Sequence, residues 1–170
     1  DLRMDEKNKE ANKFGNKSFD TFDKDKKKKI RKINREIRQI HKLDREADKL
    51  EAHGKIDEAK QKRQDSARLK DDAIGKSIDA YHIDISKTKS VKYNPLTNGE
   101  GETSSEGAVS IGDAAFHSAG WLGSTVGHEA EVHVNEQLKK GNWYTGAMGT
   151  NIQEVQTYQY ELDNSKRYGT

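Results

Sequence analysis

Apolar residues in the first half of the chain recur at steps of three and four, which is the spacing of one face of a helix. The stripe contains Phe19, Phe22, Ile30, Ile33, Ile37, Ile40, Leu43, Ala47 and Leu50. Gly54 follows its last member, and a glycine in this place is a common helix end. A second apolar pattern over residues 56–78 then predicts two antiparallel helices, an αα-hairpin. We expect the polar residues 1–17 to form a frayed start.

After residue 80 the pattern changes to period two, which indicates short β-strands. We expect strands over residues 81–86, 90–93 and 108–111, with a loop over residues 94–107 that is rich in turn-forming residues. Two further helices are predicted over residues 118–140 and 151–167. The sequence therefore predicts an α+β fold. We expect residues 1–79 to form a charged helical hairpin. We expect residues 80–170 to form a small antiparallel sheet with two facing site helices.

The first predicted helix has an apolar stripe and a basic run, and each could contact either another surface or solvent. The second helix has too few apolar residues to cover the apolar stripe, so we expect part of the stripe to dock on the second half of the chain or on another protein. A basic run over residues 26–32 could bind nucleic acid or a membrane surface. Acidic residues flank this run and no aromatic residue lies within it, so we interpret it as a solvated helix face.

Charge and aromatic content divide the chain at the same place as the apolar pattern. Residues 1–74 contain 23 Lys and Arg against 17 Asp and Glu, a balance of +6, whereas residues 75–170 contain 8 against 12, a balance of −4. All Trp and Tyr residues follow residue 80, so we expect a pocket in the second half. The absence of cysteine excludes disulfides and Cys-ligated metals, and no apolar run approaches a membrane span.

Candidate chemistry is concentrated in the segment Gly-His-Glu-Ala-Glu-Val-His over residues 127–133. A zinc hydrolase needs imidazole or carboxylate ligands and a carboxylate that takes a proton from water, and in the HExxH helix the two histidines are four residues apart. His128 and His133 are five apart, which places them roughly 140° apart on a regular helix. A π-bulge would return both to one face. In a regular helix, Glu129 and His133 would share a face and His128 would point elsewhere.

The predicted last helix carries a second set of candidate residues. Glu154, Tyr158 and Glu161 are spaced to lie on one stripe of that helix. Glu154 could be a third metal ligand, Tyr158 could stabilise an oxyanion, and Glu161 could hold a ligand histidine by its second nitrogen. The alternatives are a solvated acidic helix face and histidines with a structural or surface role. Gly123 and Gly127 are four apart, and we expect them to let another backbone approach their helix closely.

These two segments carry a family resemblance. The Gly-His-Glu-x-x-x-His segment with Gln137, a Gly-rich loop, and an Asn-x-x-Glu-x-x-x-Tyr helix that ends in residues 164–169 resemble the zincin-like C-terminal toxin domains of Rhs-type polymorphic effector proteins. The resemblance covers roughly residues 108–170 and leaves out the hairpin. It implies a metal site for Zn²⁺ with His128, His133 and Glu154 as ligands, Glu129 as general base and Tyr158 nearby.

The resemblance also implies a biological setting. Such domains are released from a large secreted effector, act in the target cell and are neutralised by a cognate immunity protein. Because the chain starts at Asp1 rather than Met, we expect a fragment of a longer polypeptide.

Three functions follow from these patterns. The first is a zinc metallopeptidase, an antibacterial toxin that cleaves an amide in protein or in peptidoglycan. The second is a metal-dependent nuclease toxin, which His128, His133 and Asn135 and the basic hairpin suggest. The third is a non-enzymatic helical interaction module. The negative balance of the second half disfavours an anionic polymer, so we do not expect nucleic acid as the substrate.

Overall fold

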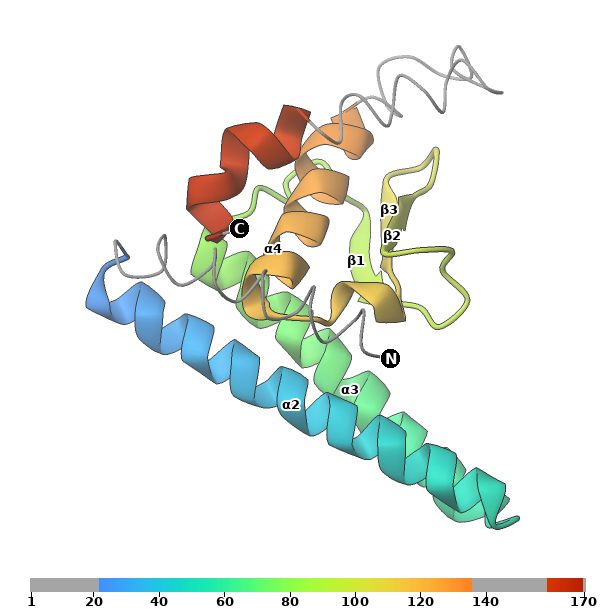
Figure 1. Ribbon diagram of the computed structural model, residues 1–170. Helices are drawn as coiled ribbons and strands as arrows, with labels where there is room; N and C mark the ends of the chain where they lie inside the picture. Colours follow the sequence, from blue (N-terminus) through green and yellow to red (C-terminus); the bar gives the residue numbers. More distant parts are fainter. Residues whose placement is uncertain (1–21, 136–158, 170) are drawn as a thin grey trace.

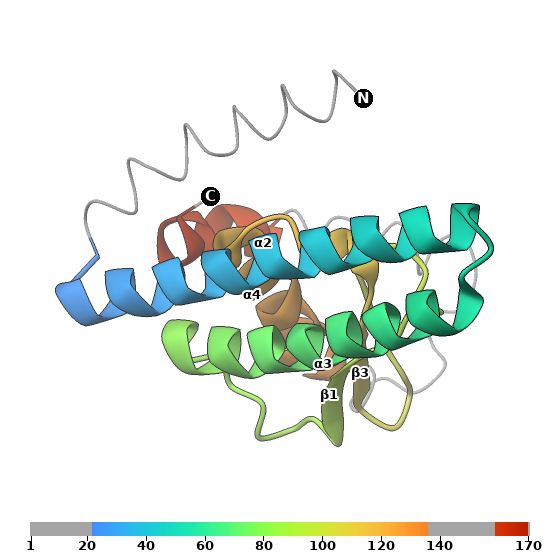
Figure 2. The same ribbon diagram turned by 90° about the horizontal axis from the view of Figure 1, so that it is seen from below.

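Two long antiparallel helices form the predicted hairpin in the computed structural model, which describes residues 22–135 and 159–169. Helix α2 covers Lys24–Ala52 and helix α3 covers Ile56–Tyr81 (Figures 1 and 2). The carboxylate of Asp23 caps α2 by accepting a hydrogen bond from the Lys26 amide at 2.8 Å. The hairpin is confirmed over this range, whereas the predicted frayed start over residues 1–17 lies outside the described residues.

The apolar stripe of α2 packs on two neighbours. Ile33 and Ile40 are fully buried, and α2 contacts both α3 and α4 (Ala119–Gly127). The side-chain oxygen of Asn34 accepts a hydrogen bond from the Ala119 amide at 2.8 Å, which attaches the start of α4 to α2. The prediction that part of the stripe docks on the second half of the chain is therefore confirmed.

The three strands form a mixed sheet rather than the predicted antiparallel one. Strands β1 (Ser90–Tyr93), β2 (Gly101–Thr103) and β3 (Ala108–Ile111) lie in the order β1-β3-β2. Strand β3 is parallel to β1 and antiparallel to β2. Strand β2 lies within residues 94–107, which were predicted to be a loop. The turn-forming residues there concealed the signal of a strand only three residues long. Because that strand reverses the chain before β3 begins, β3 enters the sheet in the direction of β1.

The prediction of a strand over residues 81–86 is wrong. Tyr81 ends α3, and His82 follows with φ 51° as a left-handed helix cap. Tyr81 and Ile83 are both buried, so their period-two spacing reflects a capped turn that packs into the core rather than a strand. A six-residue alternation is too short to distinguish these two cases.

Helix α4 lies between the sheet and the C-terminal helix over residues 159–168 (Figure 1). Its first turn is capped by the Ser118 hydroxyl, which accepts a hydrogen bond from the Trp121 amide at 3.2 Å. Beyond Gly127 the same helix continues as a π-helix, His128–His133. One cluster of buried apolar side chains joins the hairpin, the sheet, α4 and the C-terminal helix. Within the described ranges, no helix is both long and apolar enough to cross a membrane.

Candidate metal centre

The two candidate histidines lie on one face because the helix that carries them is a π-helix over His128–His133. In a π-helix, hydrogen bonds join residues i and i+5, so residues five apart lie one turn above each other. The Nε2 atoms of His128 and His133 are 2.6 Å apart, and the ring planes are inclined by 83°. Of the two alternatives that the spacing allows, the structure therefore has the one that brings both imidazoles together.

Glu129 completes a cluster of possible metal ligands with these two histidines. One ligand atom from each of the three residues lies within 4.8 Å of the others. The Thr103 hydroxyl on β2 donates a hydrogen bond to Glu129 Oε2 at 2.5 Å. Gly101 makes room for this carboxylate, because a Cβ at that position would lie 2.9 Å from Glu129 Cγ. The cluster could hold a metal ion, and β2 fixes its carboxylate.

The donor geometry and protonation state suit a cation. Two nitrogens at about 2.0–2.1 Å from a tetrahedral zinc ion are about 3.3 Å apart, so the rings need to separate by less than about 1 Å. His128 is 7% exposed. Burial, with the nearby His133 ring as a second cause, lowers the pKa of His128 to about 3. His128 is therefore neutral at pH 7, which is the form that binds metals.

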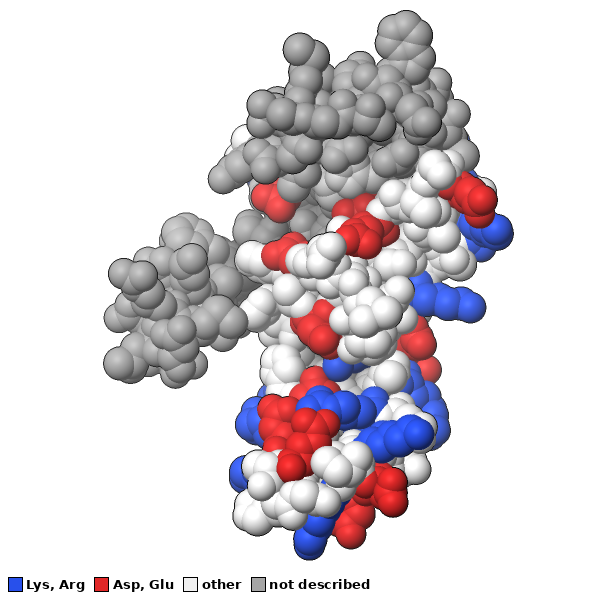
Figure 3. Space-filling model, turned by 90° about the vertical axis from the view of Figure 1, so that its right-hand side faces the viewer, with Lys and Arg blue, Asp and Glu red and all other residues white. Residues whose placement is uncertain are grey.

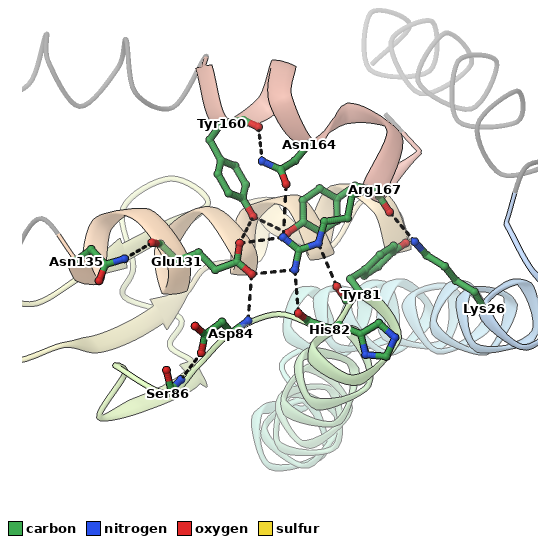
Figure 4. Close-up of polar contacts among 11 residues, drawn as sticks. Lys26, Tyr81, His82, Asp84, Ser86, Glu131, Asn135, Tyr160, Asn164 and Arg167 are labelled. Carbon is green, nitrogen blue, oxygen red and sulfur yellow. Dashed lines mark hydrogen bonds and ion pairs between the residues drawn. The ribbon is translucent and has the colours of Figure 1, made fainter.

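A salt bridge to the C-terminal helix holds the opposite side of the π-helix (Figure 4). Both Glu131 oxygens accept hydrogen bonds from Arg167, each at 2.8 Å. Arg167 also donates to the backbone oxygens of Tyr81 and His82, at 3.1 and 2.9 Å. Glu131 accepts one further hydrogen bond from the Asp84 amide at 3.0 Å. The network thereby ties the π-helix to the end of α3 and to the C-terminal helix.

The charge of Glu131 is stabilised within this network. Burial alone would raise its pKa, but the hydrogen bonds from Arg167 and from the Asp84 amide outweigh burial, and the pKa is lowered. Sequence reasoning missed Glu131 and Arg167 as site-supporting residues. The only signal was an acidic residue between the two histidines, and its partner lies 36 positions away along the chain.

Aromatic rings, and not a backbone, fill the space that Gly123 and Gly127 leave. A Cβ at Gly123 would lie 2.5 Å from the Tyr81 ring, and a Cβ at Gly127 would overlap the hydroxyls of Tyr160 and Tyr168. These two hydroxyls are hydrogen-bonded to each other at 2.5 Å. The expectation that a backbone approaches here is therefore wrong, because the ring of Tyr81 from α3 and the tyrosines of the C-terminal helix occupy this space.

Tyr160 is the tyrosine of the C-terminal helix that reaches the described cluster. Its ring packs edge-on against His128 with 5.5 Å between ring centroids. Its hydroxyl donates a hydrogen bond to Glu131 at 3.1 Å, on the side of the π-helix that faces the salt bridge. Two predicted site residues, Glu154 and Tyr158, lie outside the described residues, as does Gln137.

Glu161 is described, and it lines a pocket of about 320 Å³ together with Glu100, Trp121 and Thr125. Burial raises the pKa of Glu161. Burial also raises the pKa of Glu100, and the negative charge of Glu161 raises it further. A hydrogen bond from Thr125 lowers this pKa but does not outweigh burial. The structure thus places Glu161 beside a second carboxylate, where the sequence predicted a contact with a ligand histidine.

A larger pocket opens directly beside the metal-ligand cluster. It has a volume of about 400 Å³ and is lined by Glu129 and His133 on one side and by residues of β2 and β3 on the other. Glu102 adds a second acidic group to this pocket. Figure 3 shows several acidic side chains over the half of the molecule that carries the sheet, with basic side chains at its edge, and both signs of charge at the far end of the hairpin. The geometry provides space for a substrate next to the cluster and a negative surrounding charge.

Comparison of this chain with known protein families, with curated protein sequences and with solved structures finds no match.

Proposed function

We propose that this chain is a zinc-dependent amide hydrolase, a metallopeptidase, in which His128 and His133 bind Zn²⁺ and Glu129 acts as general base. The observation that carries the proposal is the convergence of the two Nε2 atoms on one face of the π-helix, with the Glu129 carboxylate beside them. A ligand set of imidazole nitrogens with a carboxylate oxygen is one that zinc accepts. Glu154 is the proposed third ligand, from the predicted last helix.

Each residue has a defined task in this proposal. Bound zinc supplies Lewis acidity and lowers the pKa of a water molecule. The imidazoles of His128 and His133 would bind the cation through Nε2. The Glu129 carboxylate, held by Thr103, would accept a proton from water as the water oxygen bonds to the amide carbon, and would pass this proton to the nitrogen that leaves when the C–N bond breaks. The pocket beside Glu129 and His133 receives the amide.

An amide is a better candidate substrate than a phosphodiester because of the charge around the cluster. Glu102 and Glu129 both line the adjacent pocket, and residues 75–170 have a balance of −4 (8 basic residues less 12 acidic ones). Such a field repels an anionic polymer from the reacting centre. In the setting implied by the family resemblance, the domain is the toxin of a secreted antibacterial effector. Its substrate is then a protein or peptidoglycan, and a cognate immunity protein blocks it.

The test combines Glu129→Gln with a measurement of metal content. We expect the wild-type protein to cleave peptides or peptidoglycan fragments, and we expect Glu129→Gln to lose at least about 100-fold in turnover, as for other general bases. The variant retains zinc if Glu129 is the base. If it loses zinc together with activity, Glu129 is a ligand and the assigned role is wrong. Activity of Glu129→Gln equal to wild type contradicts the proposal.

A further inference from the structure

The N-terminal part of α2 is strongly basic. Residues 26–42 contain nine Lys and Arg and one acidic residue, Glu36, which gives a formal charge of +8. Glu36 is 8% exposed and is paired with Lys76 of α3, so it does not offset the basic side chains at the surface. Lys26 and Lys29 also have partners within the fold, and helix α2 still presents several exposed basic side chains.

Part of this charge lies on one face of the helix. Five exposed residues follow each other at steps of three and four, and we call them the basic face: Lys28, Arg31, Arg35, Arg38 and Lys42. The first four line a surface hollow of about 310 Å³ around Asn34. The hollow borders the start of α4, because Asn34 accepts the hydrogen bond from Ala119. The buried isoleucines of α2 occupy the other side of the helix.

We propose that the basic face is a docking surface for an acidic surface of a partner protein. Three of its five members are arginines, whose planar forks bind carboxylates through two parallel hydrogen bonds. The 17 residues extend over about 25 Å of helix, a length that fits one face of a partner domain. Such charge complementarity sets the rate and the specificity of association.

Two features favour a protein over a nucleic acid as the partner. Acidic residues bound the segment at both ends, with Asp23 and Asp25 before it and Asp44 and Glu46 after it. A long polyanion that followed the helix would meet these carboxylates, whereas a protein surface of limited size would not. The segment also contains no Phe, Tyr or Trp on which bases could stack.

The basic face and the candidate metal centre are separate features. The face lies on α2, whereas the pocket beside Glu129 opens between the π-helix and the sheet. The two halves also have opposite charge, since residues 75–170 are acidic. The docking proposal therefore holds whether or not the chain is a hydrolase.

The probe for this proposal is a synthetic helical peptide of about 21 residues with Glu at steps of three and four, long enough to span the whole face. Binding to the full chain is measured by fluorescence anisotropy at low and at physiological salt. We compare Arg31→Gln/Arg35→Gln/Arg38→Gln with a control that removes three exposed charges from α3 and its N-cap, Lys55→Gln/Lys60→Gln/Arg68→Gln. A Gln version of the peptide and a 12-base-pair DNA duplex serve as competing probes.

We expect the Glu peptide to bind the wild type, with affinity that falls as salt rises. The α2 variant should bind about tenfold more weakly, and the control variant should stay within about twofold of wild type. Equal losses in both variants, or no binding of the Glu peptide at low salt, would overturn the proposal. Tighter binding of the duplex, lost in the α2 variant, would assign the face to nucleic acid instead.

The substituted residues are exposed, so both variants should fold, and circular dichroism checks this. A second variant, Lys28→Gln/Lys42→Gln, keeps the three arginines and changes only the two ends of the face. We expect it to lose less affinity than the arginine variant, because lysine cannot make the bidentate contact. A larger loss at the ends than at the arginines would contradict the assignment of the hollow as the centre of the docking surface.

Discussion

At Gly127 the absence of a side chain decides whether the C-terminal helix can pack beside the candidate metal centre. A Cβ there would overlap the hydroxyls of Tyr160 and Tyr168. We expect Gly127→Ala to lower the free energy of unfolding by about 1–3 kcal/mol, since overpacking forces rings or backbone to shift. Urea unfolding measures this change. The matched control is Gly75→Ala in α3, where a Cβ meets nothing within 4 Å. That change should raise stability by about 0.5–1 kcal/mol, and a loss at Gly75 as large as at Gly127 would contradict the packing argument.

Thr103 positions the carboxylate of Glu129 through the 2.5 Å hydrogen bond from its hydroxyl. If Glu129 is the general base, Thr103→Val should lower turnover by about tenfold while zinc content stays the same, because the base loses its fixed orientation. Thr103→Ser keeps the hydroxyl and should restore most of the rate. Steady-state kinetics with metal analysis on the same samples tests this. Equal rates for the Val and Ser variants would show that the hydroxyl is not used.

His128 makes the stability of the metal-free protein depend on pH. Burial and the His133 ring lower its folded pKa to about 3, below the unfolded value of about 6.5. Between these values the unfolded chain binds a proton that the folded chain does not, so this contribution to stability is complete above about pH 6.5 and is lost as pH falls towards 3.

The expected result is a shallower fall of the free energy of unfolding in His128→Gln than in wild type between about pH 6.5 and 4. The difference in slope should be at most about 1.4 kcal/mol per pH unit, which corresponds to one proton. Urea unfolding of metal-free protein at several pH values gives both slopes. Parallel slopes would mean that His128 titrates normally in the folded chain.

At the scale of elements, the salt bridge between Glu131 and Arg167 attaches the C-terminal helix to the π-helix. Arg167→Gln leaves a partly buried carboxylate without its partner, so we expect a loss of about 1–3 kcal/mol in the free energy of unfolding. It should also weaken zinc binding, because the π-helix loses its support. Arg63→Gln removes an exposed pair of salt bridges to Asp48 and Glu51 and should cost at most about 1 kcal/mol. Equal losses for both variants would argue against the supporting role.

The elements that the sequence predicted best are those with long, regular patterns. The stripe with Ile33 and Ile40 extends over several turns, so α2 could be assigned with its buried face. The turn at Tyr81 and Ile83 was mistaken for a strand, because a short alternation arises from either structure. Strand β2 is three residues long and contains Gly101, whose role becomes clear only from its contact with Glu129.

The π-helix could be stated from the sequence only as one of two alternatives. From the spacing of His128 and His133 one can say that a π-helix places both side chains on one face and that an α-helix does not. The spacing does not say which of the two helix types forms. Contacts from distant segments surround the π-helix: Arg167 with Glu131, and Thr103 with Glu129. Such tertiary contacts leave no local signal, so the sequence pointed to His128, Glu129 and His133 but neither to the residues that hold them in place nor to their geometry.

At the scale of the whole molecule, the hairpin serves as the platform on which the candidate metal centre is built. Helices α2 and α3 both contact α4, and Tyr81 at the end of α3 packs against Tyr168 of the C-terminal helix with 5.1 Å between ring centroids. The hairpin thus supports α4, from which the π-helix continues. The basic face lies on α2 and the acidic pocket lies beside the π-helix, so the proposed partner docking and the proposed chemistry would use different surfaces.

The zinc content of the purified protein after equilibration with zinc at neutral pH decides whether His128 and His133 form a metal centre. We expect about one zinc ion per chain in the wild type, its loss in His133→Ala, and its retention in His53→Ala, which changes an exposed histidine at the end of the hairpin. Absence of zinc from the wild type, or equal zinc in His133→Ala and wild type, would contradict the claim that His128 and His133 form a metal centre.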